Sequence, residues 1–318
     1  MLALNKTNLL GIIVILSACG SDEPNPGPGP GPGPGPEKEA VVSTAAVEVL
    51  GYDPAPGQFV NLLPEYTAGD TYESMVAKVQ KSIDDGDCIT LGAWGGSVTL
   101  RLKQPLARVE GKPSFRVLGN AFYSTEADGD ELFGSSEPGI ILVMTDTNGN
   151  GKPDDEWLEI SSSEMTNALS PYTVTYTRPT SEPEDYPAEG YIKWTDNNAQ
   201  SGSFTKLEYH TQPYYPQWVS SNTISFSGRR LPDNGYYDEE TGYHNLKCYT
   251  YGYADAHPNN ADASLIYLDW AVKANGQPAN VERIDFIKVY TGVLQENGWL
   301  GECSTEVAGI QRIDYVAK

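Results

Sequence analysis

The sequence is poor in the residues on which most metalloenzymes and hydrolases depend. Its 318 residues include only four cysteines and three histidines. The zinc-protease pattern HExxH, the nucleophile pattern GxSxG and the dinucleotide pattern GxGxxG are all absent. His210 and His257 lie in predicted loops without a nucleophile motif, so we expect them at the surface. These absences favour a protein that is not an enzyme.

Basic residues are also scarce. There are 21 Lys and Arg residues against 43 Asp and Glu residues, which gives a formal charge of −22. A surface of this sign repels phosphate backbones, so we expect no nucleic-acid partner. It is compatible with exposure to solvent and with divalent cations.

The N-terminal apolar run, residues 9–16, is too short to span a bilayer as a stable helix. It is followed by Leu16-Ser17-Ala18-Cys19, which resembles a bacterial lipobox. We therefore expect residues 1–18 to be a lipoprotein signal peptide and Cys19 to carry the lipid. The acidic residues just after Cys19 resemble the surface-export signal of Bacteroidetes lipoproteins. This resemblance implies an outer-membrane protein that faces the outside and contacts the membrane only through its lipid anchor.

A nearly pure Gly-Pro repeat fills residues 24–36. Proline removes backbone donors, so this stretch cannot join a helix or a sheet. We interpret residues 19–39 as a tether that holds the body away from the membrane. The body contains three cysteines, Cys88, Cys248 and Cys303, and either a Cys248–Cys303 disulfide or three free thiols fits the sequence.

Short runs of alternating apolar residues, separated by Gly, Pro and Asn, predict a mainly β body. Such strands pack as an antiparallel β-sandwich or jelly roll. Two sandwiches, over residues 40–160 and 161–318, or one continuous domain over 40–318 both fit. The predicted strands cover residues 42–50, 89–93, 98–102, 115–123, 140–144, 157–160, 172–177, 191–194, 204–209, 223–227, 246–253, 264–272 and 283–291.

One short helix is predicted near residues 71–83. Asp70 is the expected N-cap, because Glu73 follows three residues later as in a capping box. Met75, Val79 and Ile83 recur at helical spacing, so we expect this face to pack against a sheet.

The stretch that begins at Asp146 has the spacing of an EF-hand-type calcium loop. Oxygen-bearing side chains stand at its positions 1, 3, 5 and 9, and Gly151 stands at position 6. Position 12 is Trp157 rather than Glu, so Asp155 or Glu156 must complete the shell. The alternative is a plain Asn-Gly turn. We predict a structural calcium site without flanking helices, with ligands Asp146, Asn148, Asn150, Lys152 (through its carbonyl), Asp154, Asp155 and Glu156.

Tyrosine is concentrated between Tyr209 and Tyr253, which include nine of the 20 tyrosines. Much of this segment is predicted loop, where aromatic residues are less easily explained as core. Tyr and Trp offer flat apolar faces with a polar tip, which suit sugar rings and flat macrocycles. The alternative is that the rings cap the core. The ligand-binding candidates are Tyr214, Tyr215, Trp218, Tyr236, Tyr237 and Tyr243.

Several stretches together resemble a family of Bacteroidetes cell-surface lipoproteins, some of them described as PKD-like. They are residues 91–100, 117–122, 155–157, 194–197, 251–255, 284–291 and 298–302. The resemblance implies an accessory component of TonB-dependent outer-membrane transporters, including those for cobalamin. It identifies no ligand residue.

These observations predict a non-catalytic surface lipoprotein that binds a glycan or a corrinoid. Its expected partner is a TonB-dependent transporter or the surface lipoprotein of that transporter. One alternative is an adhesin or structural module held rigid by calcium. A glycan-active hydrolase is a further alternative, although no acid pair stands out in the sequence.

Overall fold

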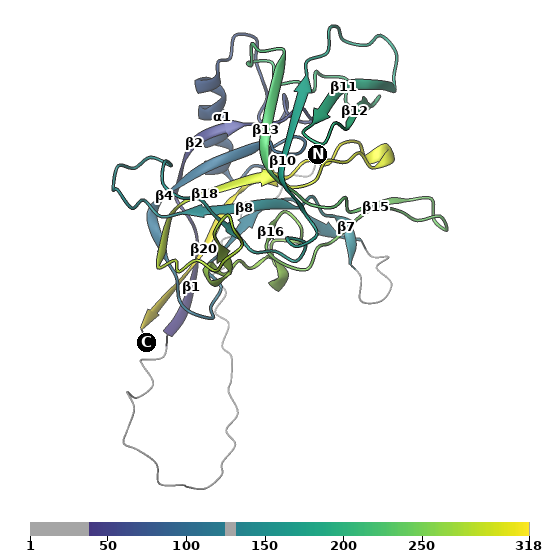
Figure 1. Cartoon of the computed structure of the whole chain (residues 1–318). Coiled ribbons are helices and arrows are strands. Elements are labelled where there is room, and N and C mark those ends of the chain that lie inside the picture. Colours follow the sequence, from purple (N-terminus) through teal and green to yellow (C-terminus); the bar gives the residue numbers. More distant parts are fainter. Residues whose placement is uncertain (1–37, 125–131, 318) are drawn as a thin grey trace, which may run out of the picture. The chain divides into compact units, whose positions relative to one another are not determined.

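The structure, a computed structural model, describes residues 38–124 and 132–317 (Figure 1). The predicted signal peptide, Cys19 and the Gly-Pro stretch lie outside these residues. Lys38 and Glu39, which the sequence assigned to the tether, instead begin strand β1 (Lys38–Thr44).

The largest sheet has seven antiparallel strands in the order β17-β9-β8-β18-β4-β2, and β16 also pairs with β8. It combines four strands from residues up to 160 with three strands from residues after 160. The long strand β18 lies between β4 and β8 and has the bounds that the sequence predicts. The strands are β2 (Val47–Asp53), β4 (Ser97–Ala107), β8 (Gly139–Met144), β9 (Leu158–Ile160), β16 (Tyr253–Ala254), β17 (Ala271–Val272) and β18 (Arg283–Thr291).

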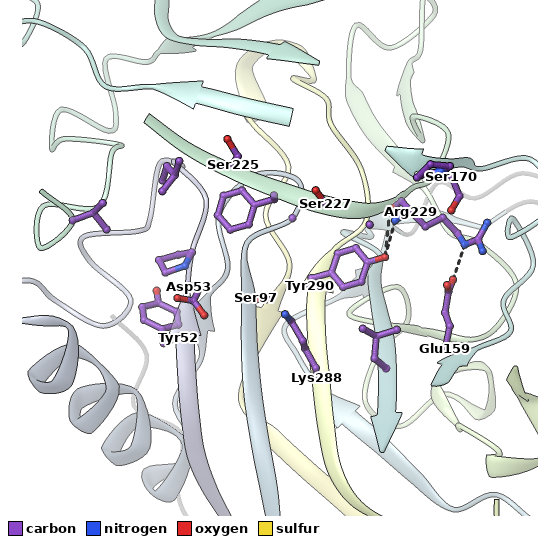
Figure 2. Close-up of a pocket in the computed structure, with 18 of the residues that line it drawn as sticks. Tyr52, Asp53, Ser97, Glu159, Ser170, Ser225, Ser227, Arg229, Lys288 and Tyr290 are labelled. Carbon is purple, nitrogen blue, oxygen red and sulfur yellow. Dashed lines mark hydrogen bonds and ion pairs between the residues drawn. The ribbon is translucent and has the colours of Figure 1, made fainter. Parts of the chain in front are cut away.

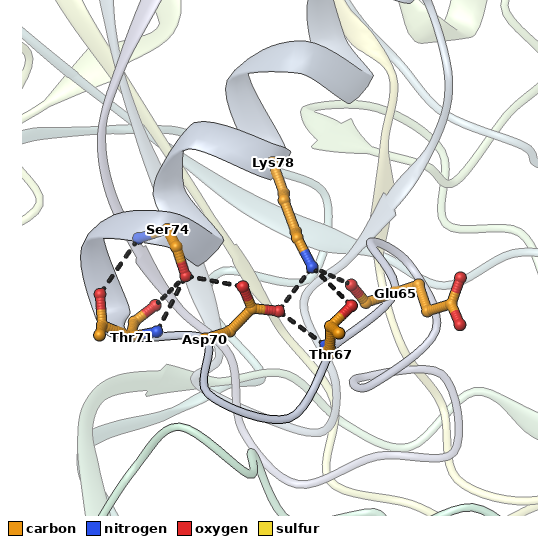
Figure 3. A network of polar contacts seen from close by, with 6 residues as sticks. All are labelled: Glu65, Thr67, Asp70, Thr71, Ser74 and Lys78. Carbon is orange, nitrogen blue, oxygen red and sulfur yellow. Dashed lines mark hydrogen bonds and ion pairs between the residues drawn. The ribbon is translucent and has the colours of Figure 1, made fainter.

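The single α-helix of the described residues, α1 (Tyr72–Asp85), packs against β2 and β3 through Met75, Val79 and Ile83. Its N-cap is Thr71 and not Asp70. Thr71 and Ser74 form a reciprocal capping box, in which the Ser74 amide donates to Thr71 Oγ1 at 3.3 Å. Figure 3 shows Asp70 beside this box, where its carboxylate accepts from Ser74 Oγ, the Thr67 amide and Lys78.

A second antiparallel sheet has the order β12-β11-β10-β13. One of its faces contributes to a core that also contains Trp94, Tyr214 and Tyr215. In Figure 1, β10 and β13 extend from the level of β8 and β18 toward the end that carries β11 and β12. The strands are β10 (Leu169–Thr177), β11 (Ala188–Asp196), β12 (Ser201–Lys206) and β13 (Thr223–Arg230).

Three smaller antiparallel sheets complete the fold. They have the orders β1-β20-β5, β14-β15-β7-β6 and β19-β3, and β1 pairs with β20 near the C-terminus (Figure 1). The strands are β3 (Ile89–Thr90), β5 (Phe115–Leu118), β6 (Phe122–Tyr123), β7 (Phe133–Ser135), β14 (Gly235–Tyr237), β15 (His244–Lys247), β19 (Glu306–Val307) and β20 (Gly309–Ala317).

The mainly β prediction is confirmed, and the antiparallel sheets fit the β-sandwich class. Four predicted strands are wrong in detail. Residues 42–50 are divided between β1 and β2, and residues 115–123 between β5 and β6, and the two strands of each pair belong to different sheets. Residues 246–253 form the end of β15 and the start of β16 with bends between them. Residues 264–272 contain the 3₁₀ turn η2 (Leu268–Trp270) and only two strand residues, and they follow η1 (Asp262–Ser264). The third 3₁₀ turn is η3 (Gly298–Leu300).

The structure also bears on the cysteines and on membrane-spanning helices. Cys88, Cys248 and Cys303 are free thiols. In the part of the chain that the structure describes, no helix combines the length and apolar character needed to cross a bilayer.

Candidate ligand-binding site

The calcium-like loop connects β8 to β9 and is folded around its own polar side chains. The carboxylate of Asp146 accepts from the amides of Asn150 and Gly151, at 3.1 and 2.8 Å. The side-chain amides of Asn148 and Asn150 both point at Asp154, at 3.0–3.2 Å, and Asn150 is the main cause of the lowered pKa of Asp154. The first, third, fifth and ninth positions therefore converge, as a cation loop requires.

The remaining predicted ligands lie differently. Asp155 accepts from both the amide and the hydroxyl of Thr147, so its carboxylate links the end of the loop to its start. Glu156 has an exposed side chain. Lys152, predicted to bind through its carbonyl, donates its amide to Asn150 Oδ1 at 2.7 Å. The loop is held against the sheet by Asp285, which accepts from the Asp146 amide at 2.9 Å.

The tyrosine-rich segment divides into buried and exposed parts. Tyr214 and Tyr215 are 1% exposed, and their rings belong to the core shared with Trp94. The prediction that they contact a ligand is therefore corrected. This loop is buried because its polar groups have partners: the Leu207 amide donates to Tyr214 Oη, and Tyr215 Oη donates to the Ser221 carbonyl.

Trp218 is half-buried and stacks on Tyr52, with ring centroids 5.9 Å apart. Tyr236 and Tyr237 lie on the short strand β14 and are exposed. Tyr236 packs beside Phe133, and Tyr237 packs beside His244. Tyr243 lies in the turn between β14 and β15, and it lines a cavity.

That cavity, which we call the aromatic cleft, has a volume of about 900 Å³. Its rim carries rings from four separate segments: β6, the loop after β12, the turn before β15 together with β15, and η3. Four of the rings, those of Phe122, Tyr209, Tyr243 and Trp299, are 54–78% exposed. The rim residues are Phe122, Tyr209, His210, Tyr243, His244 and Trp299.

Two of the rim residues, His210 and His244, are held by contacts with neighbouring side chains. His210 stands edge-on to Phe59, with centroids 4.7 Å apart. His244 Nδ1 donates to Asn297 Oδ1 at 3.2 Å, and its ring stands edge-on to Trp299. The turn η3 therefore presents Trp299 to solvent at the edge of a fixed support, with one face free to contact a ligand.

The floor of the aromatic cleft is acidic. Glu137, which precedes β8, and Glu306, which begins β19, both line it. Asp255 joins them, and one carboxylate oxygen from each of the three residues lies within 4.8 Å of the other two. We call Glu137, Asp255 and Glu306 the carboxylate triad.

Asp255 is positioned by its own backbone. Its φ of 51° places it in the left-handed region, and its carboxylate accepts from the amides of Asn120, Ala121 and Glu306, each at 2.9 Å. A side chain at Gly119 would collide with Asp255 Oδ1, since a Cβ there would lie 2.3 Å away. The triad thus depends on a close approach of three distant segments.

Within residues 38–124 and 132–317, no basic side chain forms an ion pair with the triad. Burial raises the pKa values of all three carboxyls, and repulsion within the triad raises those of Asp255 and Glu306 further. Three acids in this position need protons or a bound cation.

A fourth acid, Glu302, is buried nearby. Its Oε2 accepts from the Gln58 amide at 2.8 Å, whereas its Oε1 has no partner. Burial raises its pKa well above the ordinary range, and repulsion from Glu137 adds to this.

The folded state therefore holds the Glu302 proton more tightly than the unfolded state does. The cost of ionising it is absent below the unfolded pKa of about 4.3 and grows as pH rises toward the folded pKa. We expect Glu302→Gln to stabilise the protein by about 1–2 kcal/mol at pH 8 and by much less at pH 4. Thermal melts of the two proteins from pH 4 to 8 measure this, with the exposed Glu240→Gln as control. A loss of stability at pH 8 would contradict the assignment.

A second cavity, the inter-sheet pocket, has a volume of about 680 Å³ (Figure 2). It lies between β13 and the strands β2, β4 and β18. Figure 2 shows Lys288 between Tyr52 and Tyr290, and the Glu159–Arg229 pair at the opposite end. Tyr52 and Tyr290 are buried. The Tyr52 hydroxyl donates to the Thr90 carbonyl, and the Tyr290 hydroxyl accepts from the Arg229 amide. Glu159 and Arg229 form an ion pair at 2.8 Å. Much of its polar lining is therefore already occupied by protein partners.

No family model matches the sequence, and no curated protein matches it.

No sequence pattern identified the carboxylate triad as a site. Asp255 lies within one of the stretches that carry the family resemblance, and Asn120, whose amide it binds, lies in another. No motif spacing joins the three acids, because each comes from a different part of the chain.

His257, expected at the surface, is buried, and its Nδ1 contacts Tyr123 Oη at 3.0 Å.

Proposed function

We propose that this protein is a non-catalytic, surface-exposed lipoprotein that captures a glycan in the aromatic cleft and assists a TonB-dependent transporter. The observation that carries the proposal is the group of exposed rings around a cavity with a carboxylate floor. Rings of this kind cover the apolar face of a sugar, and carboxylates accept hydrogen bonds from its hydroxyls. In the inter-sheet pocket, Glu159 and Arg229 are paired with each other, and the Tyr52 and Tyr290 hydroxyls have backbone partners.

Of the two ligand classes that the sequence predicts, the cleft favours the glycan. A volume of about 900 Å³ accommodates a short oligosaccharide.

The same geometry favours binding over hydrolysis. A retaining glycosidase needs one ionised carboxylate as nucleophile and one protonated acid, about 5–5.5 Å apart. Here burial raises the pKa values of Glu137 and Glu306 together. Neither residue is set apart as an ionised nucleophile.

Calcium in the loop at Asp146–Asp154 is part of the proposal, as a structural ion that keeps the β8–β9 connection rigid. The convergence of Asp146, Asn148, Asn150 and Asp154 supports it. A rigid, non-binding adhesin module remains the alternative if no soluble ligand is found.

Calorimetric titration of the full chain with a panel of glycans and with cobalamin tests the proposal. We expect binding to a glycan, and we expect Trp299→Ala to weaken it at least 10-fold, which corresponds to about 1.4 kcal/mol. Tyr251→Ala is the control, because Tyr251 is similarly placed at the surface but does not line the cleft.

Three results would count against the proposal. The first is no binding to any member of the panel. The second is glycan binding that Trp299→Ala leaves unchanged, which would place the ligand elsewhere. The third is turnover of the glycan, which would establish the hydrolase alternative.

A further inference from the structure

We propose that the carboxylate triad binds a divalent cation of the calcium class at the floor of the aromatic cleft. The inference deepens the proposed function, because the ion would face the glycan, but it can be tested with the metal alone. It concerns a site distinct from the loop at Asp146–Asp154.

The first argument is geometric. One oxygen each from Glu137, Asp255 and Glu306 lies within 4.8 Å of the other two. Calcium binds oxygens at 2.3–2.6 Å, so two ligands on opposite sides of one ion are about 5 Å apart. The three oxygens can therefore share one ion of the size of calcium.

The second argument is an unused oxygen. Glu306 is 3% exposed, it lines the cleft, and its Oε1 has no hydrogen-bond partner. A buried carboxylate oxygen without a partner is costly, and a bound cation removes that cost. By contrast, the Asp255 oxygens already accept three amides, which fix the direction in which their remaining lone pairs point.

The third argument concerns the donor set. The triad offers only oxygen ligands. Glu306 pairs with Thr90 across β19 and β3, and the Thr90 and Ser304 hydroxyls contact each other. The Ser304 amide donates to Glu137 Oε1 at 2.9 Å. Oxygen-only sites suit hard cations. Three protein ligands leave calcium with open positions on the side of the cleft, which water or two hydroxyls of a sugar can fill.

The experiment is a calcium titration of the full chain by calorimetry, in four proteins. They are the wild type, Asp146→Ala, Glu306→Gln and the double variant. Asp146→Ala removes the loop site, and Glu306→Gln keeps the size of the side chain while removing its charge. We expect Asp146→Ala to bind one calcium ion and the double variant to bind none.

Calcium binding that is the same in Asp146→Ala and in the double variant would overturn the inference, as would no binding to Asp146→Ala. Either result would mean that the triad shares protons instead. Melts in chelator establish that each variant is folded, and Glu137→Gln replaces Glu306→Gln if the latter does not fold. Glycan binding that persists in chelator would leave the proposed function standing without the cation.

Discussion

Trp94→Ala is expected to lower the free energy of unfolding by about 3–5 kcal/mol. Trp94 is completely buried, and it packs edge-on against Tyr172 of β10 and Tyr290 of β18. Its Nε1 donates to the Arg229 carbonyl of β13 at 3.1 Å. The residue thus joins the seven-stranded sheet to the β12-β11-β10-β13 sheet, and alanine would leave a cavity at their contact.

Denaturant unfolding of the variant measures this loss. The matched control is Trp299→Ala, which makes the same chemical change at a residue that is 56% exposed. We expect the control to change stability by no more than about 1 kcal/mol. Similar losses for the two variants would mean that Trp94 does not link the sheets.

Arg229→Met is expected to cost about 3–5 kcal/mol at pH 7. Arg229 and Glu159 are both mostly buried, and their side chains form an ion pair at 2.8 Å. Removing the guanidinium leaves the Glu159 carboxylate buried without its partner. Burial already raises the pKa of Glu159, and Arg229 is the group that lowers it.

A double-variant cycle separates this effect from lost packing. Arg229→Met with Glu159→Gln should be more stable than Arg229→Met alone, because no uncompensated charge remains. Arg229→Met should also lose less stability at acid pH, where Glu159 binds a proton in both the folded and the unfolded state. The exposed pair Lys81–Asp85 provides the control, and Lys81→Met should cost less than about 0.5 kcal/mol. Additive losses in the cycle would argue that the pair is not coupled.

The fold class follows from patterns that act over a few residues. Strand β18 has the predicted bounds because its apolar residues alternate and because pairing partners flank it on both sides. The helix is also found, although Ser74 makes Thr71 the cap where the acid at position 73 suggested Asp70.

Other elements depend on tertiary contacts that no local pattern contains. Tyr249 and Tyr253 are buried, but Tyr251 between them is 38% exposed, so the three do not share one strand face. They lie in a bent segment in which only Tyr253 enters a ladder. Strand β20 has no strong local signal and is specified by its partners β1 and β5. Tyr214 and Tyr215 were assigned to a ligand because loops are usually exposed, whereas Asn61 binds this loop's carbonyls and lets it enter the core.

The candidate site was predictable only in part. Of the six predicted ligand-binding residues, only Tyr243 lines the aromatic cleft. Tyr236 and Tyr237 are exposed on β14 but do not line it, and Trp218 lines the inter-sheet pocket. The acids at the floor were not predicted, because a carboxylate in the sequence carries no sign of whether it will be buried. Only the fold brings Glu137 and Glu306 into the lining of the cavity that Trp299 also lines.

The most direct measurement is a crystal structure of the full chain grown with calcium and with a glycan selected by calorimetry. We expect the sugar to lie on Trp299 within the aromatic cleft, with a cation held by Glu137, Asp255 and Glu306 beneath it. A sugar bound in the inter-sheet pocket, with the aromatic cleft containing only solvent, would contradict the account.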